Sequence, residues 1–177
     1  MSIQELTSRK GKLLGALARL LDYPSENYLD SFDSVTDQCV QLCPDAKPLL
    51  LEFSKFVSEN TRSKLEETFT RNFDLAPLCS PYVSGYIYGD ENFDRGSLLS
   101  RLNDRFEEIG FDRKGELCDH LGVLLSFSEH LSFEEIDDLC ELVLVAPLKE
   151  MVSRLAECQS PYHPLMKAIE IAVKTHQ

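Results

Sequence analysis

The sequence lacks any run of about 20 apolar residues, the length that a membrane-spanning helix needs. It also lacks a basic N-terminal region followed by an apolar stretch and a small-residue cleavage site, so we expect no secretory signal. Basic residues are few, since 18 lysines and arginines stand against 30 aspartates and glutamates. The formal charge of -12 disfavours nucleic acid and anionic membranes as partners. We therefore expect a cytoplasmic protein without stable membrane association.

Signatures of common catalytic and metal sites are absent as well. The sequence has no Gly-x-Ser-x-Gly, no P-loop and no Gly-x-Gly-x-x-Gly motif. Zinc and iron–sulfur sites usually need about four ligands, often from Cys-x-x-Cys pairs, and no such pair occurs here. We therefore predict no metal site and no enzymatic activity. We expect buried, reduced thiols at the six cysteines, Cys39, Cys43, Cys79, Cys118, Cys140 and Cys158.

Apolar residues recur at helical spacing along most of the 177 residues, and 43% of the chain is hydrophobic. This length suits one domain, spanning residues 1–177, with a substantial core. Capping boxes are expected at Ser63 with Glu66 and at Ser132 with Glu135, and Pro147 should kink or split the helix that contains it. The pattern predicts an all-α, single-domain bundle of about seven to nine helices.

Helical spacing disappears between Asp74 and Phe93. Prolines and glycines punctuate this segment, which predicts an ordered, irregular connection. Alternation would also permit a short strand around Tyr82 and Tyr86, but no partner strand is evident. A long connection in a compact domain usually has a function, and this one combines tyrosines with carboxylates. It is therefore the first candidate for a binding surface.

A second candidate is the sequence Glu-Leu-Cys-Asp-His-Leu at residues 116–121, directly before an apolar run. Asp119 is expected to cap the helix that follows, and Glu116 places negative charge near the positive end of the helix dipole. Such a polar cluster beside a packed wall can hold a charged ligand. The simpler interpretation is a capped helix with a histidine on the surface.

The order of these motifs along the chain is similar to that of a known protein family. Phe69 is followed by Phe-Asp-Leu-Ala-Pro at 73–77, then by Tyr-Gly-Asp at 88–90, Arg-Gly at 95–96 and the 116–121 motif. This order resembles the NarJ/TorD/DmsD family of cytoplasmic chaperones that mature molybdenum-cofactor oxidoreductases, and most of all its NarJ branch. The chain departs from relatives at Cys118, where they often have proline, at Gly122 after the motif, and at Phe69, where a tyrosine is often seen.

The resemblance implies a chaperone that binds the N-terminal, twin-arginine-like leader peptide of the catalytic subunit of a molybdenum oxidoreductase. It implies no tightly bound cofactor, although transient contact with the molybdenum cofactor or a nucleotide is left open. We expect a monomer or a weak homodimer. Two alternatives stay open: a nucleotide or molybdopterin site at Asp119 and His120, and a plain helical adaptor. The expected peptide-binding residues are Phe69, Phe73, Asp74, Tyr82, Tyr86, Tyr88, Asp90, Glu116, Asp119, His120 and Leu121.

Overall fold

Helices make up nearly all regular structure in the computed structural model, which describes residues 3–89 and 93–175. Within these residues the only pairing of extended chain is an isolated antiparallel bridge. The predicted all-α, single-domain bundle is confirmed, with nine α-helices in the described residues when α8, η3 and α9 count as one continuous helix. In chain order the elements are α1 (Ile3–Leu20), α2 (Glu26–Leu42), η1 (Pro44–Ala46), α3 (Lys47–Glu59), α4 (Arg62–Phe73), α5 (Val83–Tyr88), α6 (Phe93–Ile109), α7 (Leu121–Phe127), η2 (Ser128–His130), α8 (Phe133–Asp138), η3 (Leu139–Leu144), α9 (Val145–Glu157) and α10 (His163–Lys174).

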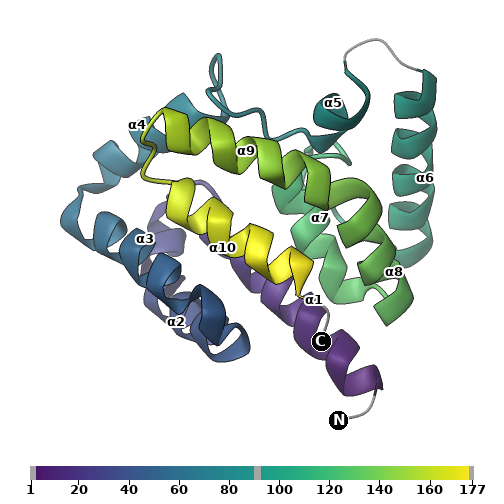
Figure 1. The fold of residues 1–177 in the computed structure, drawn as a ribbon, viewed down its shortest axis with the longest axis horizontal. Coiled ribbons are helices and arrows are strands. Elements are labelled where there is room, and N and C mark those ends of the chain that lie inside the picture. Colours follow the sequence, from purple (N-terminus) through teal and green to yellow (C-terminus); the bar gives the residue numbers. More distant parts are fainter. Residues whose placement is uncertain (1–2, 90–92, 176–177) are drawn as a thin grey trace.

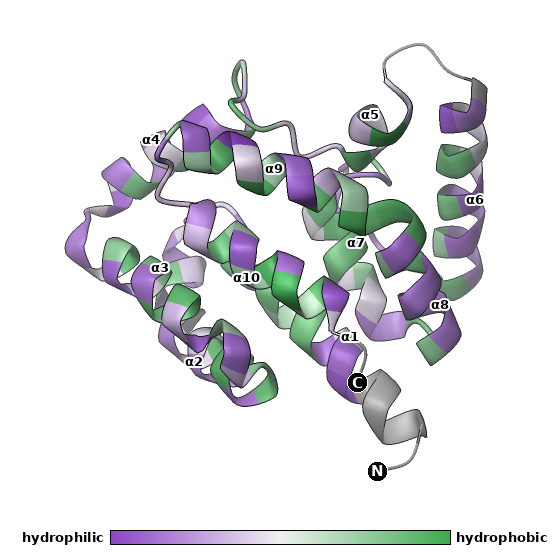
Figure 2. Ribbon diagram, in the orientation of Figure 1, coloured by the Kyte–Doolittle hydropathy of each residue, from purple (hydrophilic) through white to green (hydrophobic). Residues whose placement is uncertain are grey.

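Helix α1 lies in the middle of the bundle and packs against α2, α7, α8 and α10 (Figure 1). Its regularly spaced leucines, including Leu14 and Leu17, are buried as the spacing predicts. Each fully buried leucine contributes roughly 1.5–3 kcal/mol of hydrophobic stabilisation. Hydrophobic residues also recur along α10 (Figure 2), and those at Leu165 and Ile169 are buried. None of the described helices has both the length and the apolar character required to span a bilayer.

The capping box before α8 is confirmed. The Ser132 hydroxyl accepts a hydrogen bond from the main-chain N–H of Glu135, and the Glu135 carboxylate accepts one from the N–H of Ser132 at 2.8 Å. Further along the same helix, a π-helical turn (η3) precedes Pro147, which lies in the first turn of α9. Proline lacks the N–H that a continuous α-helix would use there. The expected interruption therefore takes the form of a π-helical turn within a continuous helix.

The expected capping box at Ser63 and Glu66 is wrong. Helix α4 begins two residues earlier than that spacing implies, and its N-cap is Thr61, whose hydroxyl accepts a hydrogen bond from the N–H of Lys64. Ser63 therefore lies inside the first turn. The Glu66 carboxylate instead pairs with Arg62 one turn back, at 2.8 Å.

The expectation of an irregular connection from Asp74 to Phe93 is wrong for residues 83–88, which form helix α5. This short helix packs against α6 and α9 (Figure 1). It ends at Gly89, whose φ of 72° lies in the left-handed region that glycine tolerates. A six-residue helix is unstable alone, so tertiary contacts stabilise it, and its periodicity is too short to read from sequence.

Helix α6 lies along one edge of the molecule (Figure 1). Its C-terminal half is fastened by Phe106, which packs edge-to-face against Phe127 with ring centroids 4.3 Å apart. Arg105 adds an ion pair with Glu135 at 2.8 Å. Gly110 follows the helix with a φ of 72°, which suits the C-terminal cap that its sequence position predicts.

The core also contains an aromatic cluster around the buried side chain of Tyr162. Its ring packs against four phenylalanines from α3 and α4, at centroid distances between 5.0 and 6.3 Å. This cluster joins the loop before α10 to the two helices of the N-terminal half. Its members are Phe53, Phe56, Phe69 and Phe73.

Candidate functional site

The two candidate segments meet in space at an antiparallel bridge between Tyr82 and His120. The bridge holds the start of α5 against the start of α7. The side-chain rings of Tyr82 and His120 also pack edge-to-face, with their centroids 5.6 Å apart. Two main-chain hydrogen bonds flank the bridge, from the N–H of Val83 to the carbonyl of Asp119 (3.0 Å) and from the N–H of Leu121 to the carbonyl of Pro81 (2.8 Å).

The expected cap by Asp119 is wrong, because His120 is the N-cap of α7. Its Nδ1 accepts a hydrogen bond from the N–H of Gly122 at 3.2 Å. Burial lowers the pKa of His120 from its ordinary value, although the carboxylates of Glu116, Asp119 and Asp22 act in the opposite direction. The imidazole is therefore held in its neutral form, which the cap requires.

Asp119 is instead a buried carboxylate with 1% of its surface exposed. One oxygen, Oδ2, accepts a hydrogen bond from the hydroxyl of Ser84 in the first turn of α5. That hydroxyl in turn accepts a hydrogen bond from Nε of Arg95 in α6, at 2.8 Å. The other oxygen, Oδ1, is buried and has no hydrogen-bond partner among the described residues. We call these three residues the Arg95–Ser84–Asp119 relay.

Outside the relay lies a surface that combines apolar side chains with carboxylates. The Tyr82 hydroxyl lies 3.5 Å from the Glu116 carboxylate, to which it donates. Burial, and after it the carboxylates of Glu116, Asp119 and Asp74, raises the pKa of Tyr82. Large apolar side chains next to these acids are exposed to solvent: Leu75 is 74% exposed, Leu117 56% and Tyr23 43%. We define the Tyr82–His120 surface by Asp22, Tyr23, Asp74, Leu75, Tyr82, Glu116, Leu117 and His120.

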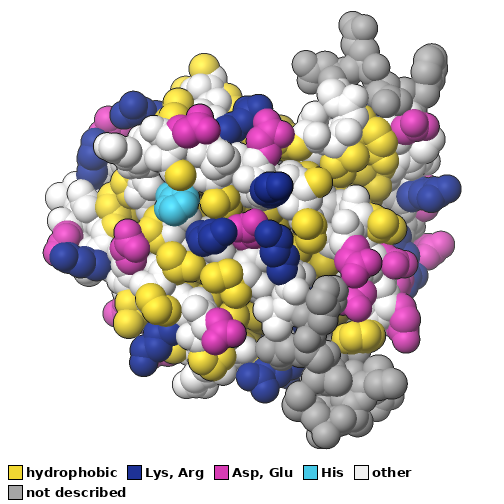
Figure 3. All heavy atoms as spheres, in the orientation of Figure 1, with side chains coloured by type: hydrophobic (Ala, Val, Ile, Leu, Met, Phe, Trp, Pro, Cys, Tyr) yellow, Lys and Arg dark blue, Asp and Glu magenta, His cyan; other side chains and the backbone are white. Residues whose placement is uncertain are grey.

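Three carboxylates of this surface, on Asp22, Asp74 and Glu116, form no ion pair within residues 3–89 and 93–175. Elsewhere in the described chain some acids are paired, as Glu150 is with Arg154, and others, such as Glu141, form no ion pair there. On the face shown in Figure 3, basic and acidic side chains are interspersed. The Tyr82–His120 surface therefore carries local negative charge that a cationic partner can neutralise.

The other expected site residues occupy three kinds of position. Tyr86 is half-buried, donates to the carbonyl of Ser80 at 2.9 Å and lies under the guanidinium of Arg154. Tyr88 is partly exposed at the end of α5, whereas Leu121 is fully buried. Asp90 lies outside the described residues. Tyr86 therefore contacts α9 and the loop before α5, and Leu121 belongs to the core directly behind His120.

Phe69 and Phe73 belong mainly to the aromatic cluster around Tyr162. Phe73 is buried, but Phe69 is half-buried and packs edge-to-face on Tyr23, with centroids 5.5 Å apart. Tyr23 follows Asp22, whose carboxylate influences the pKa of His120. Phe69 therefore lies at the border of the Tyr82–His120 surface, and Phe73 lies behind it.

The cysteines form no metal cluster: among the described residues, no three His, Cys, Asp or Glu side chains are grouped as a metal ion would require. All six thiols are free. Five are buried, as expected, but Cys158 is exposed, because it lies at the C-terminal cap of α9. Burial raises the pKa of Cys39 to about 12, which keeps this thiol protonated and unreactive.

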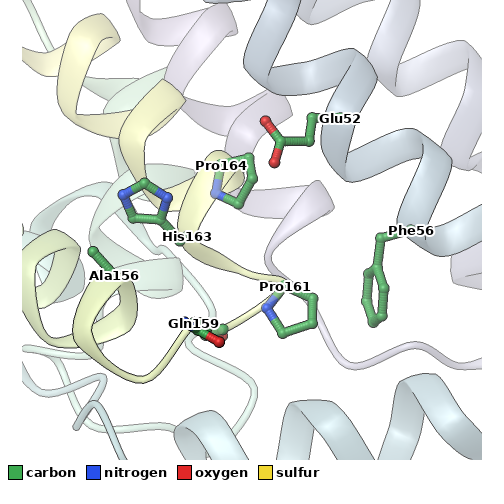
Figure 4. Close-up of a pocket in the computed structure, with 8 residues that line it drawn as sticks. Glu52, Phe56, Ala156, Gln159, Pro161, His163 and Pro164 are labelled. Carbon is green, nitrogen blue, oxygen red and sulfur yellow. The ribbon is translucent and has the colours of Figure 1, made fainter.

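A separate hollow of about 370 Å³ lies between α3 and the connection from α9 to α10. Figure 4 shows Pro161 facing Phe56 across it, with Glu52 and His163 at its rim. None of the residues expected from sequence lines this hollow. Sequence reasoning also gave no site role to Ser84 or Arg95, because a serine between tyrosines and an arginine at a helix start carry no distinctive signal alone.

The fold and the site together define a class of protein: a helical bundle with an acidic, aromatic surface. Residues 41–168 match the sequence profile of the nitrate reductase delta subunit family, so the chain belongs to this family, and the resemblance seen in the sequence is confirmed. The family is known as chaperones for the maturation of molybdenum enzymes. A comparison with curated proteins finds no match.

Proposed function

We propose that the chain is a chaperone for the catalytic subunit of a molybdenum oxidoreductase and binds the N-terminal leader peptide of that subunit on the Tyr82–His120 surface. The observation that carries this proposal is the set of unpaired carboxylates beside exposed Leu75 and Leu117. An amphipathic peptide with arginines fits such a surface, since its apolar face covers the leucines and its guanidinium groups pair with the acids. The chaperone would hold the subunit during insertion of its cofactor, without binding a cofactor tightly itself.

Calorimetric titration tests the proposal with the leader peptide of a nitrate reductase catalytic subunit. Wild type should bind it, and affinity should fall as salt rises because charge contributes to the contact. Tyr82→Ala should weaken binding by roughly tenfold, as expected for an aromatic contact residue. Glu116→Gln should weaken it by only about two- to fivefold, as expected for an exposed ion pair.

The matched control is Glu141→Gln, which removes an exposed carboxylate from η3, outside the proposed surface. This variant should bind as wild type does. Light scattering of the same samples should show a monomer or weak dimer that takes up one peptide per chain. If wild type binds no peptide, or if the Tyr82 and Glu116 variants bind as tightly as the control, the proposed function is wrong.

A further inference from the structure

The Arg95–Ser84–Asp119 relay joins an arginine to a carboxylate through a single hydroxyl. Ser84 and Asp119 are buried, with 0% and 1% of their surfaces exposed, whereas Arg95 is partly exposed. A group arriving from solvent therefore meets the relay at Arg95. The relay adjoins the Tyr82–His120 surface, because Asp119 precedes His120 and its main chain takes part in the flanking hydrogen bonds.

The relay satisfies only part of the carboxylate. Arg95 reaches Ser84 but forms no ion pair with Asp119 in the described structure, and the Oδ1 atom of Asp119 is left without a hydrogen-bond partner there. An unpaired acceptor on a buried charged group is unfavourable, because it has lost its hydration and gained no donor. A donor that reached both Oδ1 and the Ser84 hydroxyl would improve on Arg95.

A guanidinium group has the required shape. It carries five N–H donors in a rigid plane, so it can serve two neighbouring acceptors at once. A lysine ammonium is a compact point charge without this fork, and its stronger hydration makes its burial less favourable. The buried pair of Ser84 and Asp119 therefore discriminates between the two kinds of cation.

We propose that Arg95 is an internal substitute for an arginine of the bound peptide, and that the peptide guanidinium replaces it on Ser84 and in addition reaches Oδ1 of Asp119. This inference rests on the proposed function and adds a specificity-determining residue to it. Arg95 competes with the peptide and so lowers its affinity. The site that Arg95 occupies accepts the guanidinium of an arginine but not the ammonium of a lysine. The free chaperone thus keeps its buried carboxylate partly neutralised until a peptide with the right side chain arrives.

The test compares Arg95→Ala with Arg101→Ala in calorimetric titrations of a synthetic amphipathic peptide that carries two adjacent arginines. Arg101 is exposed on the same helix, so both variants lose one positive charge from α6. Removing the competitor should make Arg95→Ala bind about tenfold more tightly than Arg101→Ala, the equivalent of one charged hydrogen bond. Equal or weaker binding by Arg95→Ala would overturn the inference.

A second measurement uses the wild-type protein and does not depend on how the variants fold. The same peptide with lysines in place of its arginines should bind at least tenfold more weakly, because an ammonium cannot serve both acceptors. Equal affinity for the two peptides would also overturn the inference. Failure of wild type to bind either peptide would refute the proposed function itself, whereas binding without these differences would refute only the role of Arg95.

Discussion

At the scale of single residues, His120 links the site to pH. Its pKa is lowered in the folded protein, whereas in the unfolded chain it titrates near 6.5. The unfolded state therefore binds more protons as pH falls below about 6.5, and the free energy of unfolding decreases. The contribution of His120 to stability is fully present above that pH and is lost as pH falls toward the pKa of His120 in the folded protein. Chemical denaturation between pH 7.5 and 5 should show this decline.

His120→Asn is the matched control for this prediction. Asparagine is a good N-cap and does not titrate, so it keeps the cap of α7 while it removes the proton. The variant should lose less stability than wild type over the same pH range. Parallel stability curves for the two proteins would show that His120 does not titrate differently in the two states.

Asp119 should matter for stability as well as for binding. Replacing it with alanine leaves the buried Ser84 hydroxyl without its acceptor and removes the counter-charge that faces Arg95. The free energy of unfolding should fall by about 1–3 kcal/mol. Asp74→Ala, at an exposed position, should change it by less than about 0.5 kcal/mol. Urea unfolding of both variants gives the comparison, and equal effects would mean that Asp119 has no buried role.

The sequence identifies residues of this site better than it identifies their roles. The 116–121 motif locates Asp119 and His120, but aspartate is the commoner N-cap, and only the bridge to Tyr82 turns Asp119 inward toward Ser84. That bridge joins residues 38 positions apart in the chain. No local pattern contains it, and so the relay could not be predicted.

At the scale of elements, the packing of α1 against α7 and η2 depends on Gly11. A Cβ atom at Gly11 would lie 2.6 Å from the main-chain carbonyl oxygen of Ser128, which cannot move without shifting its helix. Gly11→Ala should therefore be destabilising. Overpacking should cost about 1–3 kcal/mol of the free energy of unfolding, and the higher helix propensity of alanine should offset up to about 1 kcal/mol of that loss. Thermal unfolding measures the net loss.

Gly96→Ala provides a control of opposite sign. This glycine lies in α6, and a Cβ atom there would meet nothing within 4 Å. The substitution should stabilise the protein by up to about 1 kcal/mol through helix propensity alone. If Gly11→Ala raised the unfolding temperature as Gly96→Ala should, the close approach of α1 to Ser128 would be absent in solution.

The sequence predicts the long elements well and the short ones poorly. The leucine spacing of α1 and the capping box before α8 each have a strong local signal. Helix α5 has only six residues, two of them tyrosines and one a glycine, and it exists because α6 and α9 pack on it. The sequence misplaces the start of α4 because Thr61 and Ser63 are both acceptable caps, and only packing decides between them.

At the scale of the whole molecule, a net charge of -12 would favour any cationic partner over most of the surface. Charge alone therefore cannot locate the binding site. The Tyr82–His120 surface joins unpaired acids and exposed leucines to the packed rings of Tyr82 and His120. The hollow by Glu52 and His163 instead joins a carboxylate to an imidazole and two prolines. The two regions lie on different elements, so binding at one is distinguishable from binding at the other.

The most direct measurement of the central claim is hydrogen–deuterium exchange with and without an arginine-bearing leader peptide. If the peptide covers the Tyr82–His120 surface, main-chain exchange should slow in residues 80–88 and 116–123. Exchange in α3 and in the connection from α9 to α10 should not change. Slower exchange confined to the hollow beside Glu52 and His163, or no change at 80–88 and 116–123 with peptide bound, would contradict the account.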